Sequence, residues 1–166
     1  MALKTDIRGM VFRYPDYFII GREQVRTFAS AVKCEDRASY HEDAAAELGY
    51  DNIVAPLTFV SILAKIVQAD FFRNVDTGYE TLQIVQVDQK FVYHKPLFAG
   101  DKVWATMEVA SVDERFGADI VVTKNHLTND DGELLLEAHT TLMGHQGDSS
   151  IQLKWDLESG QVVRTA

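Results

Sequence analysis

The sequence has a single cysteine, Cys34, among its 166 residues. One thiol cannot form an internal disulfide, so the fold requires no oxidising compartment. Basic residues are also scarce, since 16 Lys and Arg stand against 25 Asp and Glu and give a net charge of −9. A protein that neutralises nucleic-acid phosphates or binds an anionic membrane surface needs a surplus of bases. We therefore expect no nucleic-acid partner.

Long apolar runs are absent as well. No stretch approaches the ~18 uninterrupted apolar residues of a membrane span. The N-terminal segment carries Lys4, Asp6 and Arg8 and has no apolar centre, unlike a secretory signal. The five histidines show no close ligand spacing on one helix, which argues against a zinc site. A hydrophobic fraction of 46% in a chain of this length predicts one domain with a sizeable core. Without a predicted signal or membrane span, we expect a cytoplasmic protein.

The first half of the chain predicts mainly helices. Residues 17–21 (YFIIG) favour a short strand, and four apolar residues then recur with helical period, namely Val25, Phe28, Ala29 and Val32. Residues 42–50 predict a short helix with Gly49 as its stop. Pro56 suits the first turn of a long helix. That helix has one apolar face and is apolar over much of the rest, so it is expected inside the fold.

The second half changes to the period of strands. Alternation predicts strands around 85–93 and 103–109, and β-branched or apolar runs predict two more at 119–127 and 134–143. Short turns containing Gly117 and Gly132 connect them, which favours an antiparallel sheet. The order predicts an α+β class, with an antiparallel sheet wrapped around a long apolar central helix, and exposed sheet edges that a second subunit can cover.

Specific segments carry a family resemblance. Residues 86–101 (QVDQKFVYHKPLFAGD) resemble the strand-and-turn signature of MaoC-like hot-dog hydratases and dehydratases. More narrowly, the chain resembles the accessory, C-type subunit of the mycobacterial (3R)-hydroxyacyl-ACP dehydratase of fatty acid synthase II. The stretches IRGMVFRYPDYF, AAAELGY, APLTFV and TNDDGEL support this, and the similarity runs from residue 7 to 134. The resemblance implies one hot-dog domain over residues 1–143 and a C-terminal tail over 144–166.

The resemblance also implies an activity and partners. Such an enzyme is a heterodimer that removes water from a (3R)-3-hydroxyacyl thioester on acyl carrier protein and gives the trans-2-enoyl thioester for mycolic acid elongation. One subunit carries the catalytic loop, and the other shapes the acyl channel. No metal or redox cofactor is implied.

Residues 36–41 (DRASYH) contain the ends of a catalytic loop. Dehydration needs a base for the C2 proton, an acid for the leaving hydroxyl and donors for the thioester oxygen. In catalytic subunits of the resembled family the loop is approximately G-D-x-N-P-[LIV]-H, which places Asp36 and His41 on the two catalytic positions. Ala38 replaces the Asn and Glu35 the Gly. The pair is a candidate site that lacks its supporting group, and helix capping or partner contacts explain it equally well.

The start of the long helix departs from the family too. Pro56 has no N–H to donate to a thioester oxygen, so only the amides of Leu57 and Thr58 remain for that role. Further along, Phe59, Leu63, Val67 and Phe71 are candidates to line an acyl tunnel or to form plain core. Cys34 is expected to be an ordinary small residue at a helix end.

Three functions stay open from the sequence. The leading one is an acyl-binding subunit that stabilises a catalytic hot-dog paralogue. A self-sufficient homodimeric (R)-specific hydratase using Asp36 and His41 is the second. A non-enzymatic acyl-binding module is the third.

Overall fold

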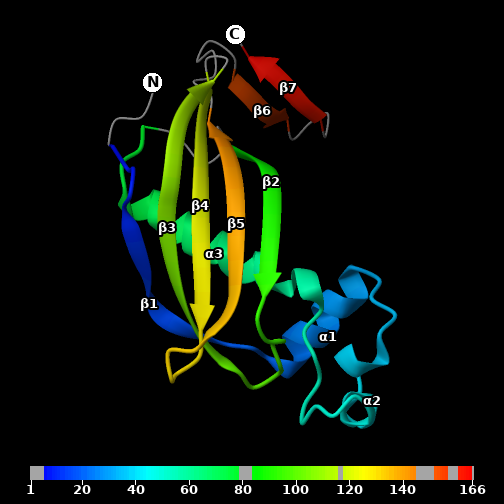
Figure 1. The fold of residues 1–166 in the computed structure, drawn as a ribbon. Coiled ribbons are helices and arrows are strands. Elements are labelled where there is room, and N and C mark those ends of the chain that lie inside the picture. The colour runs from blue at the N-terminus through cyan, green and yellow to red at the C-terminus, as the bar shows by residue number, and fades with distance from the viewer. Residues whose placement is uncertain (1–5, 79–83, 116–117, 145–151, 157–160, 166) are drawn as a thin grey trace.

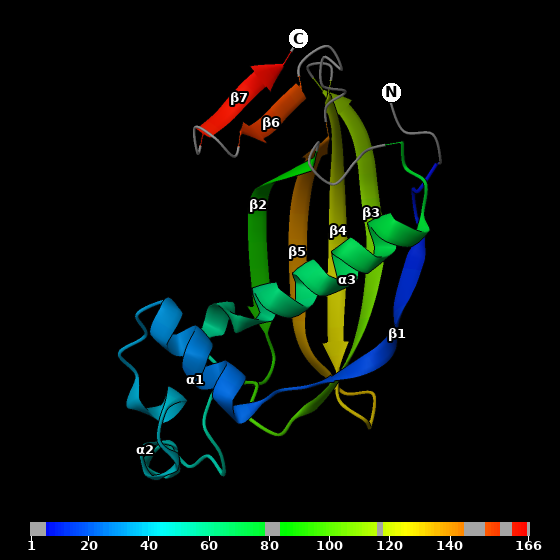
Figure 2. The same cartoon turned by 180° about the vertical axis from the view of Figure 1, so that it is seen from behind.

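The computed structural model describes residues 6–78, 84–115, 118–144, 152–156 and 161–165. A sheet stands against one long helix, with the shorter helices at one end (Figures 1 and 2). The helical elements in chain order are α1 (Arg22–Ala31), the 3₁₀ turn η1 (Arg37–Ser39), α2 (Glu42–Glu47), the 3₁₀ turn η2 (Leu57–Phe59) and α3 (Val60–Asn74). The strands are β1 (Val11–Ile19), β2 (Ile84–Tyr93), β3 (Lys102–Arg115), β4 (Ala118–Thr128), β5 (Leu134–Gly144), β6 (Gln152–Asp156) and β7 (Gln161–Thr165).

The main sheet has five antiparallel strands in the order β1-β3-β4-β5-β2. Figure 2 shows α3 lying across one face of this sheet, which we call the inner face. The opposite, outer face is turned to the viewer in Figure 1. This is the predicted hot-dog arrangement of an antiparallel sheet around a central helix, and the α+β class is confirmed. Strands β1 and β2 are the two edges of the sheet.

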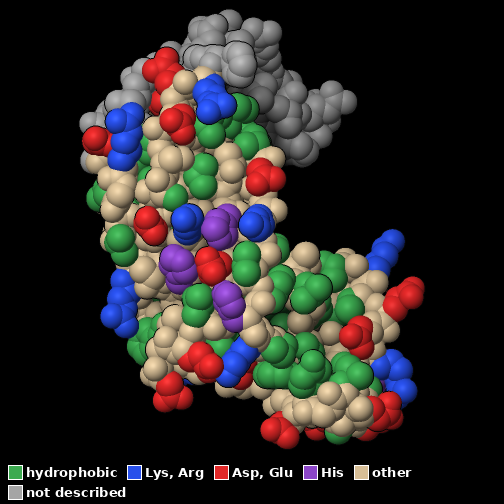
Figure 3. All heavy atoms as spheres, in the orientation of Figure 1, with side chains coloured by type: hydrophobic (Ala, Val, Ile, Leu, Met, Phe, Trp, Pro, Cys, Tyr) green, Lys and Arg blue, Asp and Glu red, His purple; other side chains and the backbone are tan. Residues whose placement is uncertain are grey.

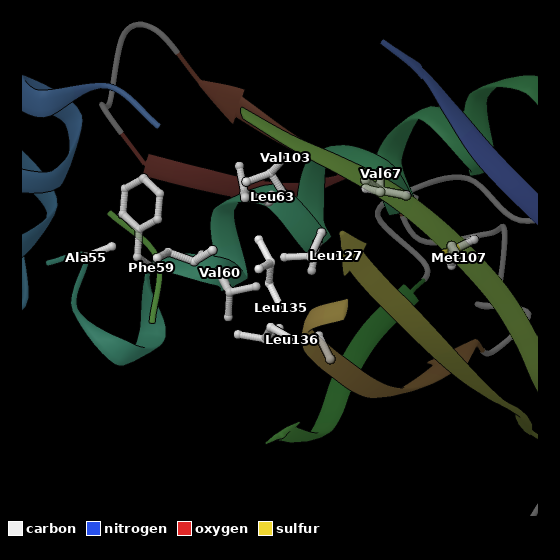
Figure 4. Packing of buried hydrophobic residues seen from close by; sticks show 14 of the residues in the cluster. Ala55, Phe59, Val60, Leu63, Val67, Val103, Met107, Leu127, Leu135 and Leu136 are labelled. Atoms are coloured by element: carbon white, nitrogen blue, oxygen red, sulfur yellow. The ribbon is translucent and has the colours of Figure 1, made fainter. Parts of the chain in front are cut away.

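The core lies between α3 and the inner face of the sheet (Figure 4). Alternate residues of β3 point into it and are all buried, as the period of two predicts: Val103, Ala105, Met107 and Val109. The predicted helix face is buried as well, and consists of Val60, Leu63, Ala64, Val67 and Phe71. Burial of such side chains stabilises the fold by about 1.5–3 kcal/mol each. The register of the sheet and the orientation of α3 therefore follow from these apolar patterns.

Strand β2 differs from its predicted alternation. The sequence places Val85 and Val87 on the same face as Phe91 and Tyr93, but the pairing of β2 with β5 shifts between Gln86 and Asp88. Such a bulge inserts one residue and reverses the phase of the side chains. Val85 and Val87 are consequently about half exposed, at 52% and 51%. The edge strand therefore presents apolar side chains that its own sheet does not cover.

Other boundaries also differ from the predicted ones. Strand β1 begins at Val11, well before residue 17, and continues through an irregularity between Arg13 and Tyr17. Pro56 lies one residue before the long helical segment, as the N-cap of η2, a 3₁₀ turn that continues directly into α3 at Val60. Beyond Gly144, β6 and β7 pair with each other in a segment where no strand was predicted. Gly117 lies outside the described residues. None of the helices in the described ranges has the length and hydropathy needed to span a bilayer.

Candidate active site

Hydrogen bonds to the carbonyl and from the hydroxyl of Tyr40 hold the loop that carries Asp36 and His41. The loop leaves α1, forms the turn η1 and enters α2. The guanidinium of Arg26, on α1, donates two hydrogen bonds to the Tyr40 carbonyl, at 2.9 and 2.6 Å. The Tyr40 hydroxyl donates to the Cys34 carbonyl at 2.8 Å. The Arg26 bonds tie the end of the loop to α1, and the Tyr40 hydroxyl ties that end to Cys34 at its start.

Asp36 and His41 occupy two different helix caps. The Asp36 carboxylate accepts a hydrogen bond from the Ala38 amide at 3.0 Å and caps η1. His41 is the N-cap residue of α2, where its side chain makes no capping hydrogen bond. Both residues are exposed, and no hydrogen bond or ion pair joins their side chains in the described part of the chain. The Asp36 side chain thus does the capping that such a residue ordinarily does at a helix start.

The residue between them is packed rather than polar. Ala38 stands where catalytic relatives are expected to have Asn, and it is buried together with Ser39. Its carbonyl accepts from the Val54 amide at 3.0 Å, which closes the loop onto the strand-like stretch before α3. Ala38 has no side-chain group that can hydrogen-bond both Asp36 and His41. The local geometry therefore lacks the support that a productive acid–base pair requires.

The predicted thioester site at Pro56–Thr58 lies at the start of η2, where Pro56 is the N-cap residue. Pro56 accepts from the Phe59 amide at 2.8 Å, and the Ser61 hydroxyl donates to the Thr58 carbonyl at 2.7 Å. The Leu57 carbonyl accepts a hydrogen bond from the hydroxyl of Tyr93, at the end of β2. Burial raises the pKa of that Tyr93 hydroxyl above its ordinary value, so it stays a donor at neutral pH. Tyr93 thereby holds η2 against the edge strand.

An apolar pocket of about 540 Å³ opens beside α3. Its walls come from the end of β1, from α1 and from the start of α3, and they include Phe18, Ile19, Phe28, Phe59, Ile62, Leu63 and Ile66. The rings of Phe28 and Phe59 meet edge to face, with centroids 5.4 Å apart. The charged group in the wall is Glu23. A pocket of this size and character is suited to a hydrocarbon chain.

The structure separates the predicted acyl-tunnel residues into two groups. Phe59 and Leu63 line the pocket. Val67 and Phe71 are buried against the sheet and do not line it. The sequence analysis did not select Phe28, Ile62 or Ile66 for this site. Ile62 and Ile66 are four residues apart and lie off the main apolar face of α3, and that spacing was the available signal.

Within the described residues, no group of three or more His, Cys, Asp and Glu side chains is arranged to hold a metal ion.

Comparisons with known proteins define the class first. A solved structure of a MaoC-like dehydratase superposes with a TM-score of 0.80 at 29% identity, covering 97% of this chain and 52% of the other. The architecture is therefore that of the MaoC-like hot-dog dehydratases.

More similar relatives come from Mycobacterium tuberculosis. A chain of the crystal structure of the C-terminally truncated HadBC (3R-hydroxyacyl-ACP dehydratase) complex is 71% identical, with a TM-score of 0.81, and covers 86% of this chain and 100% of its own. The UPF0336 protein Rv0637 is 74% identical over the full length of both chains. A family profile described as FAS1-like, dehydratase domain region, matches residues 7–138. The chain belongs to this dehydratase family.

Proposed function

We propose that the chain is a subunit of a heterodimeric (3R)-hydroxyacyl-ACP dehydratase that acts in the elongation of long, mycolic-type acyl chains. In this proposal the chain binds the acyl chain and stabilises a hot-dog paralogue that carries the complete catalytic loop. The observation that carries the proposal is the high similarity to a chain of a two-component dehydratase complex, together with a loop in which Asp36 and His41 are not joined.

The pocket supports the acyl-binding role. Its apolar wall at Phe59, Leu63 and Ile66 matches a hydrocarbon ligand, which gains about 0.8 kcal/mol for each buried CH₂. The thioester end of the substrate, held on acyl carrier protein, then lies toward the partner that performs the chemistry. In the elimination, a base takes the proton from C2. An acid protonates the C3 hydroxyl, which leaves as water.

The edge strand β2 supports the partner role. Val85 and Val87 are exposed on β2, and an exposed apolar edge is a template for another strand. The opposite edge, β1, contains Pro15 and the irregularity between Arg13 and Tyr17, which both oppose strand addition. We therefore place the paralogue along β2.

The first test measures dehydration by the reconstituted complex. We expect the chain alone to be weakly active or inactive, and the complex with a paralogue carrying an intact G-D-x-N-P-x-H loop to be active. His41→Ala in this chain should leave the activity of the complex within about threefold, because His41 takes no part in catalysis in this proposal. Loss of a true general acid or base would instead lower the activity about 10²–10⁴-fold. The control changes the matching His of the paralogue and should abolish turnover.

Two outcomes contradict the proposal. Strong dehydration by the isolated chain, lost on His41→Ala, supports a homodimeric hydratase. Acyl binding without any turnover in the presence of the paralogue supports a non-enzymatic module.

The second test addresses the edge. Val87→Lys places a charge on the exposed side of β2 and should prevent copurification of the paralogue in size-exclusion chromatography. Val11→Lys is the matched control on β1, where the replaced Val is also exposed, and should leave the complex intact. If Val11→Lys abolishes the complex and Val87→Lys does not, the interface lies along β1 and the proposed placement along β2 is wrong.

A further inference from the structure

Three histidines converge on one carboxylate on the outer face of the sheet. The Nε2 atom of His94 lies 3.0 Å from Glu137 Oε1. The Nε2 atoms of His139 and His126 lie 3.4 and 3.9 Å from Glu137 Oε2. Figure 3 shows histidine side chains gathered with Lys and acidic side chains on this face, away from α3. The proposed function makes no use of this cluster, which we call the His–Glu cluster.

The strand register holds the cluster together. Glu137 on β5 pairs directly with His126 on β4. His94 follows the last residue of β2, and its amide donates to the Leu135 carbonyl at 2.9 Å. The cluster therefore joins the edge strand β2 to β5 and β4 through side chains, beside the backbone ladder. Cross-strand side-chain pairs of this kind stabilise a sheet.

The surroundings of His139 are cationic. Lys124 on β4 and Lys90 on β2 are its direct partners in the two neighbouring strands. Acidic groups also face this part of the sheet. Glu108 on β3 pairs with Lys124, Asp88 lies two residues before Lys90, and Glu133 binds Lys95 at 2.7 Å. Glu137 is the carboxylate that the three imidazoles share.

The cluster brings three imidazoles within 3.0–3.9 Å of one carboxylate. The imidazoles are partly exposed, and histidine is the side chain whose charge ordinarily changes between about pH 5 and pH 8. The hydrogen bond with His94 holds the pKa of Glu137 below its ordinary value, with smaller contributions from His139 and His126. Any imidazolium in the cluster has the Glu137 carboxylate as its counter-ion, while Lys90 and Lys124 add positive charge beside His139.

We propose that His94, His126, His139 and Glu137 form a proton-linked clasp that holds the edge strand β2 to the sheet. While Glu137 is charged, it offsets the imidazolium groups and keeps β2 attached in mild acid. A lowered carboxyl pKa stabilises the fold at pH values above its ordinary 4.5, and this contribution is lost as the pH falls through the lowered value. The clasp consists of contacts within this chain and does not rest on the proposed function.

The test compares thermal unfolding of the full chain, without any paralogue, from about pH 8 to about pH 5. The wild type and the control Glu133→Gln should give parallel curves, since Glu133 pairs with Lys95 and no imidazole. Glu137→Gln should lose an additional roughly 2–5 °C by about pH 5.5, because the protonated imidazoles then have no counter-ion. Hydrogen exchange should quicken selectively in the β2 amides of this variant at low pH.

Several results overturn the clasp. Parallel curves for Glu137→Gln and the wild type do so, as does faster exchange spread evenly over the sheet. A rise in Tm with added Zn²⁺ at neutral pH, absent from Glu137→Gln, identifies a metal site instead. If Glu137→Gln does not fold, His139→Gln replaces it, and an unchanged pH dependence of that variant contradicts the proposal.

Discussion

The two sides of α3 carry the same kinds of residue but have different surroundings. On the sheet side Val67 and Phe71 are fully buried, and the Phe71 ring meets that of Phe12 edge to face at 5.7 Å. On the other side Ile62 and Ile66 are each 39% exposed and line the pocket. Five strands cover the first side, whereas the ten-residue helix α1 bounds the second at one end. An apolar residue of α3 is therefore part of the core where the sheet covers it, and available to a ligand where it lines the pocket.

The largest effect is expected on the sheet side. Phe71→Ala removes a ring packed against β1 and α3 and leaves a cavity that the surrounding structure fills only in part. The free energy of unfolding should fall by about 3–5 kcal/mol, as measured by urea denaturation. A loss below about 1 kcal/mol would mean that Phe71 belongs to an open tunnel, and it would remove the difference between the two sides.

A smaller effect on stability and a selective effect on activity are expected on the pocket side. Ile66→Trp narrows the pocket. The free energy of unfolding should change by no more than about 0.5 kcal/mol, because the position is partly exposed. In the reconstituted complex, kcat/KM for long acyl chains should fall about tenfold for every two CH₂ groups displaced. Short acyl chains should be turned over at the wild-type rate.

Leu48→Trp is the control for this change. Leu48 is exposed at the end of α2 and does not line the pocket. The control should leave the activity on every chain length unchanged. Equal loss on short and long chains with Ile66→Trp would show that the variant disturbs the complex rather than the acyl site.

Much of the fold could be predicted from periodicity. The buried face of α3 and the inward residues of β3 follow directly from spacings of 3.6 and 2 residues. The strand β2 could not be predicted in this way, because a bulge inserts a residue without changing the composition of the strand. The alternation likewise did not predict which polar residues are buried on the inner face. Thr123, Asn125 and Thr140 are buried on the inner face, where the Gln68 amide reaches Thr123 and the Thr140 hydroxyl reaches Gln89.

The candidate sites depended on different information. The interval between Asp36 and His41 is local, so the sequence alone displayed it, although spacing does not say whether two side chains meet. The His–Glu cluster draws on residues 94 to 139 and has no local pattern. Its members meet because β2, β4 and β5 are aligned in one register. Neither the neighbour of a strand nor its register follows from the period of its own side chains.

The family, the helix and strand periods, and the replacement of a hydrogen-bonding loop residue by Ala38 could all be recognised in the amino-acid order. Those properties reside in residue types and short spacings. The folded chain was needed to show that Val67 and Phe71 are core while Ile66 faces a pocket. It was also needed to show that Asp36 caps a turn and that three histidines surround Glu137. Packing and strand register bring together residues that are distant in the chain, and these contacts decide which side chains share an environment.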